Sequence, residues 1–316
     1  MTPWPGAGLA RSTRWLASLL VVLGLAAACN GGPSLPAGEV ATQASQAPAY
    51  ARAELLTEPD WLAANLGNDG LVVLDVRSSV SYRQGHIPGA VNLDPLALNS
   101  DGPVRGMVGP SEQVQRVLEP LGIGDASRVV IYDDDRGMWA ARIFWVLDYY
   151  GKADVSLLNG GFARWQREGR SLSTDVPETK TASLALAPNQ DHIADKSYVL
   201  AALKDKGVAL LDVRAPKEYT GATALSERGG HIPGAVNVPW EQALDEEGTF
   251  KSQSELRAMY LAVGASPDKE VVTYCQTGVR GAHGYFVLRL IGYDKVRLYD
   301  GSWEEWGNDP SLPVER

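Results

Sequence analysis

Val271-Val272-Thr273-Tyr274-Cys275-Gln276-Thr277-Gly278-Val279-Arg280 is an apolar run that ends in a cysteine and a short loop containing a glycine. Residues 271–274 are typical of a buried parallel strand, and residues 281–290, which follow the loop, are typical of a helix. Cys275 is therefore expected at a strand-to-helix turn, which is where α/β proteins place chemically active side chains.

The surroundings of this segment occur twice in the chain, because four short motifs recur in the same order. The matches pair residues 71–77 with 208–214, 86–92 with 231–237, 129–133 with 271–275, and 158–162 with 299–303. In each copy apolar strand candidates alternate with helical candidates, which is typical of a parallel sheet with helices on both faces. The sequence thus predicts two α/β domains, at about 55–170 and 196–316, joined by a linker at 171–195 that is rich in Pro, Thr and Ser.

The two copies differ at the position where chemistry is expected. Asp133 stands in the place of Cys275, and Asp134 and Asp135 follow it. A carboxylate cannot replace a thiolate as a soft nucleophile, so the first copy is predicted to be inactive. The acidic triplet can be a helix-capping or solvated turn, or it can be a cation site; the first use of adjacent acids is the more common.

Composition narrows the function further. The chain has 316 residues, of which 45% are hydrophobic and 21% charged, as in a globular protein. Its formal net charge of -9 argues against a general nucleic-acid binder, since phosphate binding needs clustered Lys and Arg. Cys29 and Cys275 are the two cysteines, which excludes a disulfide framework and a four-cysteine zinc site.

The N-terminus has the features of an export signal. Arg11 and Arg14 precede the apolar run 15–28, which is shorter than the roughly 20 residues of a comfortable membrane span. Small residues before Cys29 resemble a lipoprotein cleavage site, which predicts a signal peptide at 1–28, lipidation of Cys29 and a disordered tether through residue 54. The alternative is ordinary cleavage after residue 28 to give a soluble protein. Both interpretations place the protein on the periplasmic side of the cell envelope, and the first anchors it to the membrane.

Taken together, these residues resemble the tandem-domain rhodaneses, which are thiosulfate and 3-mercaptopyruvate sulfurtransferases. The resemblance is carried by both Asp-Val-Arg strands, both His-Ile-Pro-Gly-Ala motifs, Asp133 in place of a cysteine, and the loop that begins at Cys275. It implies an inactive first domain, a catalytic second domain whose active site faces the cleft between them, and no metal or organic cofactor.

The chemistry of the loop agrees with that role. A thiol attacks as its thiolate, and the usual cysteine pKa of about 8.5 is lowered by helix N-termini and nearby cations. The backbone N–H groups of residues 276–281 can form an anion-binding nest at the start of the helix, and Gly278 permits the tight turn. Arg280 adds forked donors suited to an oxyanion. The competing interpretation is a buried, inert cysteine that serves only to pack the core.

The resemblance implies a two-step transfer in which Cys275 becomes a persulfide. The expected partners are a small anionic sulfur donor and a thiophilic acceptor such as cyanide, a thiol or a protein. Residues predicted to bind the donor are Gln276, Thr277, Gly278, Val279 and Arg280 of the loop, together with Arg228. Arg228 ends a segment, 221–228, that is longer in the second copy and either borders the cleft or forms a solvated loop.

The donor is predicted from two departures from the mercaptopyruvate pattern, Cys-Gly-x-Gly-Val-Thr. The loop has Gln276 and Arg280 at the second and sixth positions, and Glu218 stands where those enzymes tend to carry an arginine. Both departures favour thiosulfate, and bacterial thiosulfate sulfurtransferases are the nearest resemblance. The alternatives are a 3-mercaptopyruvate sulfurtransferase, a non-catalytic sulfur carrier of the envelope, or a phosphatase, whose Cys-x5-Arg loop is one residue longer.

Several charged residues are predicted to be scaffold because the inactive copy keeps them. This group consists of the histidines His86 and His231 and the pairs Asp75 with Arg77 and Asp212 with Arg214. His283 follows the loop and is expected to face the sheet, with a general-base role as the less favoured alternative.

Overall fold

The computed structural model describes residues 50–316. The predicted signal peptide, Cys29 and all but the last residues of the predicted tether lie outside the described residues. The described residues fall in one unit, Ser45–Arg316. No helix among them combines the length and the apolar character that crossing a membrane requires.

The chain forms two five-stranded sheets in which every strand pair is parallel. The first has the order β1-β5-β4-β2-β3, with β1 Leu56–Thr57, β2 Leu71–Asp75, β3 Val91–Asn92, β4 Arg128–Tyr132 and β5 Val155–Leu158. The second repeats this order as β6-β10-β9-β7-β8, with β6 Ile193–Ala194, β7 Val208–Asp212, β8 Val236–Asn237, β9 Glu270–Tyr274 and β10 Val296–Tyr299. The predicted fold, two tandem α/β domains, is confirmed.

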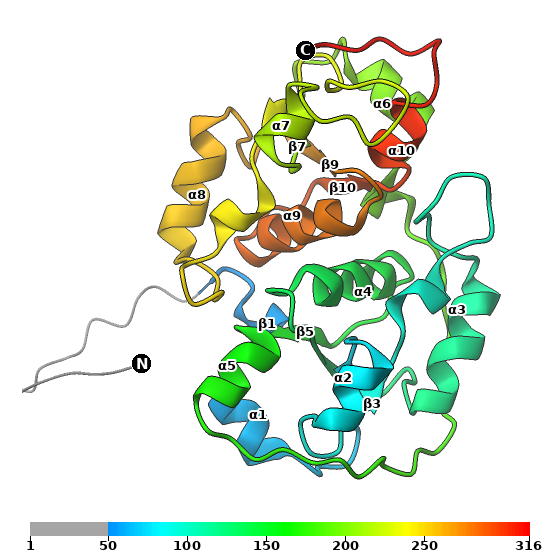
Figure 1. Ribbon diagram of the computed structural model, residues 1–316, viewed down its shortest axis with the longest axis vertical. Helices are drawn as coiled ribbons and strands as arrows, with labels where there is room; N and C mark the ends of the chain where they lie inside the picture. The colour runs from blue at the N-terminus through cyan, green and yellow to red at the C-terminus, as the bar shows by residue number, and fades with distance from the viewer. Residues whose placement is uncertain (1–49) are drawn as a thin grey trace, which may run out of the picture. The chain divides into compact units, whose positions relative to one another are not determined.

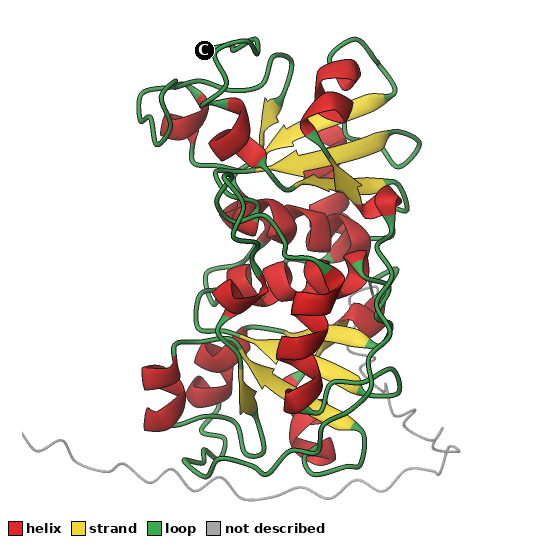
Figure 2. Ribbon diagram, turned by 90° about the vertical axis from the view of Figure 1, so that its right-hand side faces the viewer, coloured by secondary structure: helices red, strands yellow, loops and turns green. Residues whose placement is uncertain are grey.

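Helices cover both sheets (Figure 1). The first domain contains α1 Pro59–Asn65, α2 Ser79–Gln84, α3 Ser111–Leu118, α4 Met138–Tyr149 and α5 Gly161–Arg167. The second contains α6 Lys196–Ala202, α7 Pro216–Tyr219, α8 Gln253–Ala262, α9 Val279–Leu290 and α10 Ser302–Trp306. Figure 2 shows the two sheets with helices layered between them.

The strands bury both of their faces, as parallel strands do. In β4, Val129 and Ile131 join the apolar cluster that contains α4, whereas Val130 and Tyr132 face the opposite cluster. The cluster around α4 continues through α9 into the second domain, and Phe144 meets Phe286 edge to face with ring centres 4.9 Å apart. The two domains therefore share one apolar core, and α4 and α9 are its central layer.

The start of the first domain and the end of the linker differ from the expected boundaries. Tyr50 donates its hydroxyl to the carbonyls of Phe250 and Lys251, at 3.0 and 2.9 Å, and Arg52 N–H donates to the Leu290 carbonyl at 3.1 Å, so residues 50–52 are anchored to the second domain and are not tether. The linker also ends earlier than expected, because β6 already pairs with β10 of the second sheet. Short polar segments such as these give little hydrophobic pattern, which is why the sequence misplaced them.

Candidate functional site

Cys275 lies at the carboxyl end of β9, the central strand of the second sheet. Residues 275–278, the Cys275 loop, connect β9 to α9, and Gly278 has the left-handed φ of 82° that ends the loop. The predicted strand-to-helix turn is confirmed, although the helix begins at Val279, two residues earlier than expected. Cys275 is buried, with 1% of its surface exposed.

Residues that follow β10 hold the backbone of the Cys275 loop. Cys275 N–H donates to the Ser302 hydroxyl at 3.1 Å, and its carbonyl accepts from Trp303 N–H at 3.0 Å. The Gln276 carbonyl accepts from Glu304 N–H at 2.8 Å. Ser302 belongs to the repeated motif 299–303, but the sequence predicts no role for it or for Glu304, because hydrogen bonds that hold a backbone leave no sequence pattern.

The equivalent loop of the first domain, residues 133–137, is the Asp133 loop, and it holds an anion. The Asp133 carboxylate accepts from the N–H groups of Asp135 and Gly137, at 3.0 and 2.8 Å, and from those of Trp139 and Ala140, at 2.8 and 2.9 Å. Burial raises the pKa of Asp133 to about 6, against these hydrogen bonds, which lower it. The capping interpretation of the acidic triplet is confirmed for Asp133.

The two loops differ in length by one residue, because the Asp133 loop spans 133–137 and the Cys275 loop spans 275–278. When α4 and α9 are aligned from their first residues, Met138 matches Val279 and Trp139 matches Arg280. The first domain therefore lacks both the thiol and the arginine of the second.

Arg280 is paired with Glu218 of α7. Its two terminal nitrogens donate to the two Glu218 oxygens at 2.7 and 2.8 Å. Burial disfavours the charged form of Arg280 and lowers its pKa. The Glu218 hydrogen bonds and the nearby Cys275 charge outweigh this effect, so the Arg280 pKa lies above its usual value. Burial likewise opposes ionisation of Glu218, while Arg280 lowers the Glu218 pKa. Arg280 thus remains a cation beside Cys275, and Glu218 offsets its charge.

Two other predicted binding residues, Gln276 and Arg228, hydrogen-bond to neighbouring segments of the second domain. The Gln276 side chain donates to the Ser226 hydroxyl at 2.9 Å and to Glu304 at 3.3 Å, so it ties segment 221–228 to the Cys275 loop. Arg228 donates to the backbone carbonyls of Trp306, Gly307, Asp309 and Leu312. The structure therefore engages Arg228 with the C-terminal segment, and its contact with a donor stays a prediction.

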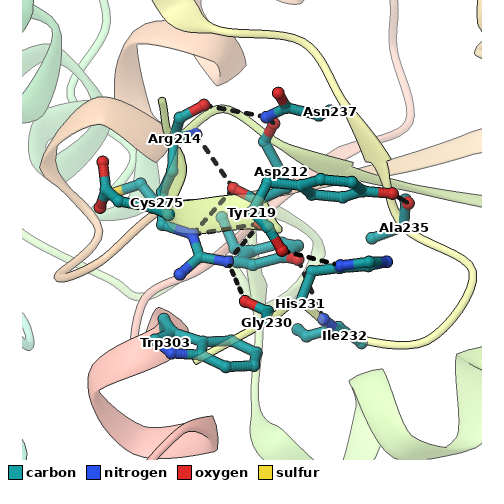
Figure 3. A network of polar contacts seen from close by, with 12 residues as sticks. Asp212, Arg214, Tyr219, Gly230, His231, Ile232, Ala235, Asn237, Cys275 and Trp303 are labelled. Carbon is teal, nitrogen blue, oxygen red and sulfur yellow. Dashed lines mark hydrogen bonds and ion pairs between the residues drawn. The ribbon is translucent and has the colours of Figure 1, made fainter. Parts of the chain in front are cut away.

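The duplicated charges form matching networks in the two domains, as a scaffold role predicts. Arg214 is paired with Asp212 and donates to the Gly230 carbonyl at 2.7 Å (Figure 3). His231 stacks on Tyr219 with ring centres 3.7 Å apart. The first domain repeats these contacts with Arg77, Asp75, Gly85, His86 and Tyr82. Figure 3 also places Cys275 and Trp303 beside this network, and the Arg214 guanidinium lies 4.5 Å from the Trp303 ring centre.

His283 is fully buried on α9 between Trp240 and Phe250, with ring centres 5.0 and 5.4 Å away. Among the described residues neither ring nitrogen has a hydrogen-bond partner, and burial lowers the His283 pKa to about 3. The ring is neutral at ordinary pH and packs as an aromatic side chain. This environment favours a packing role over general-base catalysis.

Sequence comparison with known proteins matches the Rhodanese-like domain family twice, at residues 58–168 and 195–309. The chain is 38% identical over 267 residues to a thiosulfate sulfurtransferase of Azotobacter vinelandii, covering 84% of this chain and 98% of that protein. It is 39% identical over 284 residues to the sulfur carrier protein TtuD of Thermus thermophilus, with the same coverage of both chains.

Solved structures with a similar fold include the anaerobic ergothioneine biosynthesis enzyme from Chlorobium limicola in complex with trimethyl histidine. That structure is 29% identical with a TM-score of 0.76, covering 84% of this chain and 71% of that chain. A variant of EanB with a cysteine persulfide, solved with ergothioneine, also has a TM-score of 0.76 at 28% identity. It covers 83% of this chain and 70% of that chain.

Proposed function

Because the chain belongs to the Rhodanese-like domain family and is a sulfurtransferase, we propose that it moves the outer sulfur of thiosulfate to a thiophilic acceptor through a persulfide on Cys275. The observation that carries this proposal is the position of Cys275 at the end of β9, in the loop whose counterpart binds a carboxylate through four amides.

In the first step the Cys275 thiolate attacks the outer sulfur of thiosulfate. A new S–S bond forms between Cys275 and that sulfur, while the sulfur–sulfonate bond breaks and sulfite leaves with its electron pair. The thiolate, the donor and sulfite are all anions, so the site must stabilise negative charge throughout. Arg280 supplies a fixed cation, and the start of α9 supplies amide dipoles.

The Asp133 loop supports this assignment from within the same chain. At the matching strand-to-helix turn, four N–H groups converge on one carboxylate. The Cys275 loop follows an equivalent strand, β9, and precedes a helix, α9, of the same length as α4. An anionic sulfur on Cys275 would occupy the place that the carboxylate of Asp133 fills in the first domain.

In the second step a nucleophilic acceptor attacks the terminal sulfur of the persulfide. With cyanide, a C–S bond forms, the persulfide S–S bond breaks and the Cys275 thiolate is regenerated with thiocyanate as the product. A thiol acceptor would instead carry the sulfur away as its own persulfide. The EanB structure that contains a cysteine persulfide supports this kind of intermediate in the fold.

A sulfur carrier is the second candidate function, because the TtuD protein of Thermus thermophilus is named for that activity. In that case Cys275 would hold the persulfide for a protein acceptor, and turnover with small acceptors would be slow. Steady-state turnover with thiosulfate and cyanide separates the two: an enzyme releases many thiocyanate molecules per Cys275, whereas a carrier releases about one.

Mass spectrometry of the protein after thiosulfate treatment tests the intermediate directly. We expect a mass increase of one sulfur atom that disappears when cyanide is added. Cys275→Ser should show neither the added sulfur nor turnover while remaining folded by circular dichroism. Sulfur transfer by folded Cys275→Ser at the wild-type rate contradicts the proposal.

A side-by-side comparison of thiosulfate and 3-mercaptopyruvate tests the donor. Glu218 stands where mercaptopyruvate enzymes tend to carry an arginine, and it is bound to Arg280, so this position has no arginine to hold a donor carboxylate. We expect a higher kcat/KM for thiosulfate, and a preference for mercaptopyruvate would replace the proposed donor while leaving the persulfide step in place.

The proposed location is the periplasmic side of the envelope, with Cys29 lipidated as the membrane anchor. This proposal rests on the sequence around residues 11–29. Fractionation of cells that express the full chain tests it: the wild-type protein should sediment with membranes, and Cys29→Ala should release it. Retention of Cys29→Ala on membranes contradicts the lipid anchor.

A further inference from the structure

Arg142 of the first domain and Asp300 of the second form a buried ion pair. Arg142 lies on α4, Asp300 directly follows β10, and their side chains are 1% and 0% exposed. The Arg142 guanidinium donates to an Asp300 oxygen at 2.5 Å and to the Gly106 carbonyl at 2.6 Å. The other Asp300 oxygen accepts from Val108 N–H at 2.7 Å. Asp300 is therefore satisfied entirely by groups of the first domain.

This pair lies directly against the Cys275 loop. A Cβ atom on Gly278 would sit 2.6 Å from an Asp300 oxygen and 3.1 Å from an Arg142 nitrogen. A Cβ atom on Gly106 would sit 2.7 Å from the Thr277 carbonyl. The first domain thus touches the Cys275 loop through its backbone and brings a cation to its edge.

A second pair of the same kind lies beside the first. Arg105 donates two hydrogen bonds to Glu304, at 2.7 and 2.9 Å, and these bonds lower the Glu304 pKa. Glu304 also accepts from the Gln276 side chain, and its N–H donates to the Gln276 carbonyl. Arg105 is 74% exposed, so this pair is screened more by salt than the buried one.

We propose that the first domain completes the electrostatics of the Cys275 site: Arg142 and Arg105 neutralise Asp300 and Glu304, two carboxylates of the second domain that would otherwise repel anionic sulfur. The inference deepens the proposed function and rests on it. Two further pairs near the loop lie within the second domain, where Arg280 is paired with Glu218 and Arg214 with Asp212. Each of these four acids has its own arginine, and the arginines of Asp300 and Glu304 come from the domain without a nucleophile.

An arginine that only supports the fold and one that sets the charge of the site lead to different results. If the pair is purely structural, losing either Arg142 or Asp300 destabilises the fold and changes the reactivity of Cys275 in the same direction. If it sets the charge, losing Arg142 exposes the Asp300 carboxylate to the thiolate and raises the Cys275 pKa. Losing the Asp300 charge instead leaves Arg142 uncompensated and lowers it. The two single variants should move in opposite directions, and the double variant should return close to wild type.

The experiment measures the rate at which iodoacetamide alkylates Cys275 as a function of pH in the full chain. We expect Arg142→Met to raise the apparent thiolate pKa by about one unit, a tenfold loss of thiolate below that pKa. Asp300→Asn should lower it, and Arg142→Lys should restore much of the wild-type value. Alkylation needs no sulfur donor, so the result is independent of whether thiosulfate is the substrate.

Asn159 provides a matched control, because it is the repeat counterpart of Asp300 and makes the reciprocal contact between domains. Its side-chain oxygen accepts from Phe250 N–H at 3.2 Å, on the side of the Asp133 loop. Asn159→Ala should leave alkylation unchanged. If Arg142→Met fails to fold, Arg105→Met replaces it, because Arg105 is exposed. We expect a smaller rise in the apparent thiolate pKa, and this rise should weaken at high salt. Shifts of the same sign in Arg142→Met and Asp300→Asn, or no shift in any folded variant, overturn the inference.

Discussion

Arg280 and Glu218 face each other across 62 residues of sequence with two parallel hydrogen bonds of 2.7 and 2.8 Å. Sequence alone presents Arg280 as a free cation for the donor, and the structure shows that a carboxylate has already bound it. The guanidinium is held in one orientation, and its net charge toward a ligand is reduced. We therefore expect Glu218 to determine how strongly Arg280 binds a donor.

Removing each partner should change donor binding in opposite ways. We expect Arg280→Ala to raise KM for thiosulfate by about tenfold, equivalent to about 1.4 kcal/mol. Glu218→Gln keeps the shape but removes the charge, so it should lower that KM. Steady-state kinetics at low salt measure both. Arg297→Ala, which breaks a comparable pair with Glu270 at the other end of β9, is the control, and unchanged kinetics in Arg280→Ala would remove Arg280 from the site.

Asp133 should be dispensable for chemistry but not for pH-dependent stability. Asp133→Asn is expected to keep kcat/KM within about twofold, because the residue lies in the other domain. Burial raises the Asp133 pKa from its usual 3.8 to about 6, so the folded protein binds a proton more tightly than the unfolded chain. The stabilisation is fully present below pH 3.8 and is lost as pH rises through 6. Denaturant unfolding of wild type and Asp133→Asn across this window measures the difference, and a large loss of turnover contradicts the inactive assignment.

Gly278→Ala should damage the site more than a comparable glycine elsewhere. Gly278 has φ 82°, and an added Cβ would lie 2.6 Å from Asp300. Gly264 has a similar φ of 77° with nothing within 4 Å, so Gly264→Ala carries only the backbone cost of about 1 kcal/mol. Thermal melting and turnover should show a larger loss of both in Gly278→Ala. Equal effects of the two substitutions would mean that the ion pair beneath the loop moves aside freely.

His283 should make the protein sensitive to acid without taking part in catalysis. Burial lowers the His283 pKa from 6.5 to about 3, so protonation favours the unfolded chain. Its stabilising contribution is present above pH 6.5 and falls by about 1.4 kcal/mol per pH unit toward pH 3. His283→Leu should flatten the loss of unfolding free energy in this range and leave turnover in mildly alkaline buffer nearly unchanged. Turnover that drops by about two orders of magnitude or more, the scale of a lost general base, contradicts this assignment.

The sequence predicted the architecture because the decisive patterns are local and duplicated. The apolar strands around Val130 and Val272, the repeated histidine motif and the substitution of Asp133 for Cys275 each lie within a few residues. Comparing the copies also separated scaffold from chemistry, since the charges shared by both domains form the same buried networks in each.

The sequence did not predict contacts that form only when distant segments meet. Arg142 and Asp300 are 158 residues apart, and nothing near either one indicates a partner. The sequence places Arg228 either at the border of the cleft or in a solvated loop, yet its guanidinium contacts backbone carbonyls, which have no residue signature. Such pairs depend on how two finished domains dock, which hydrophobic periodicity does not encode.

The apolar core that α4 and α9 share has a consequence for anyone who wishes to shorten the protein. Cutting the chain between the domains would leave the buried face of α9, including Phe286, open to water. An excised C-terminal half would keep Cys275 but lose the surface against which α9 packs, and we expect it to aggregate or to dimerise through that face. The domain without a nucleophile therefore keeps the catalytic domain soluble by covering the apolar face of α9.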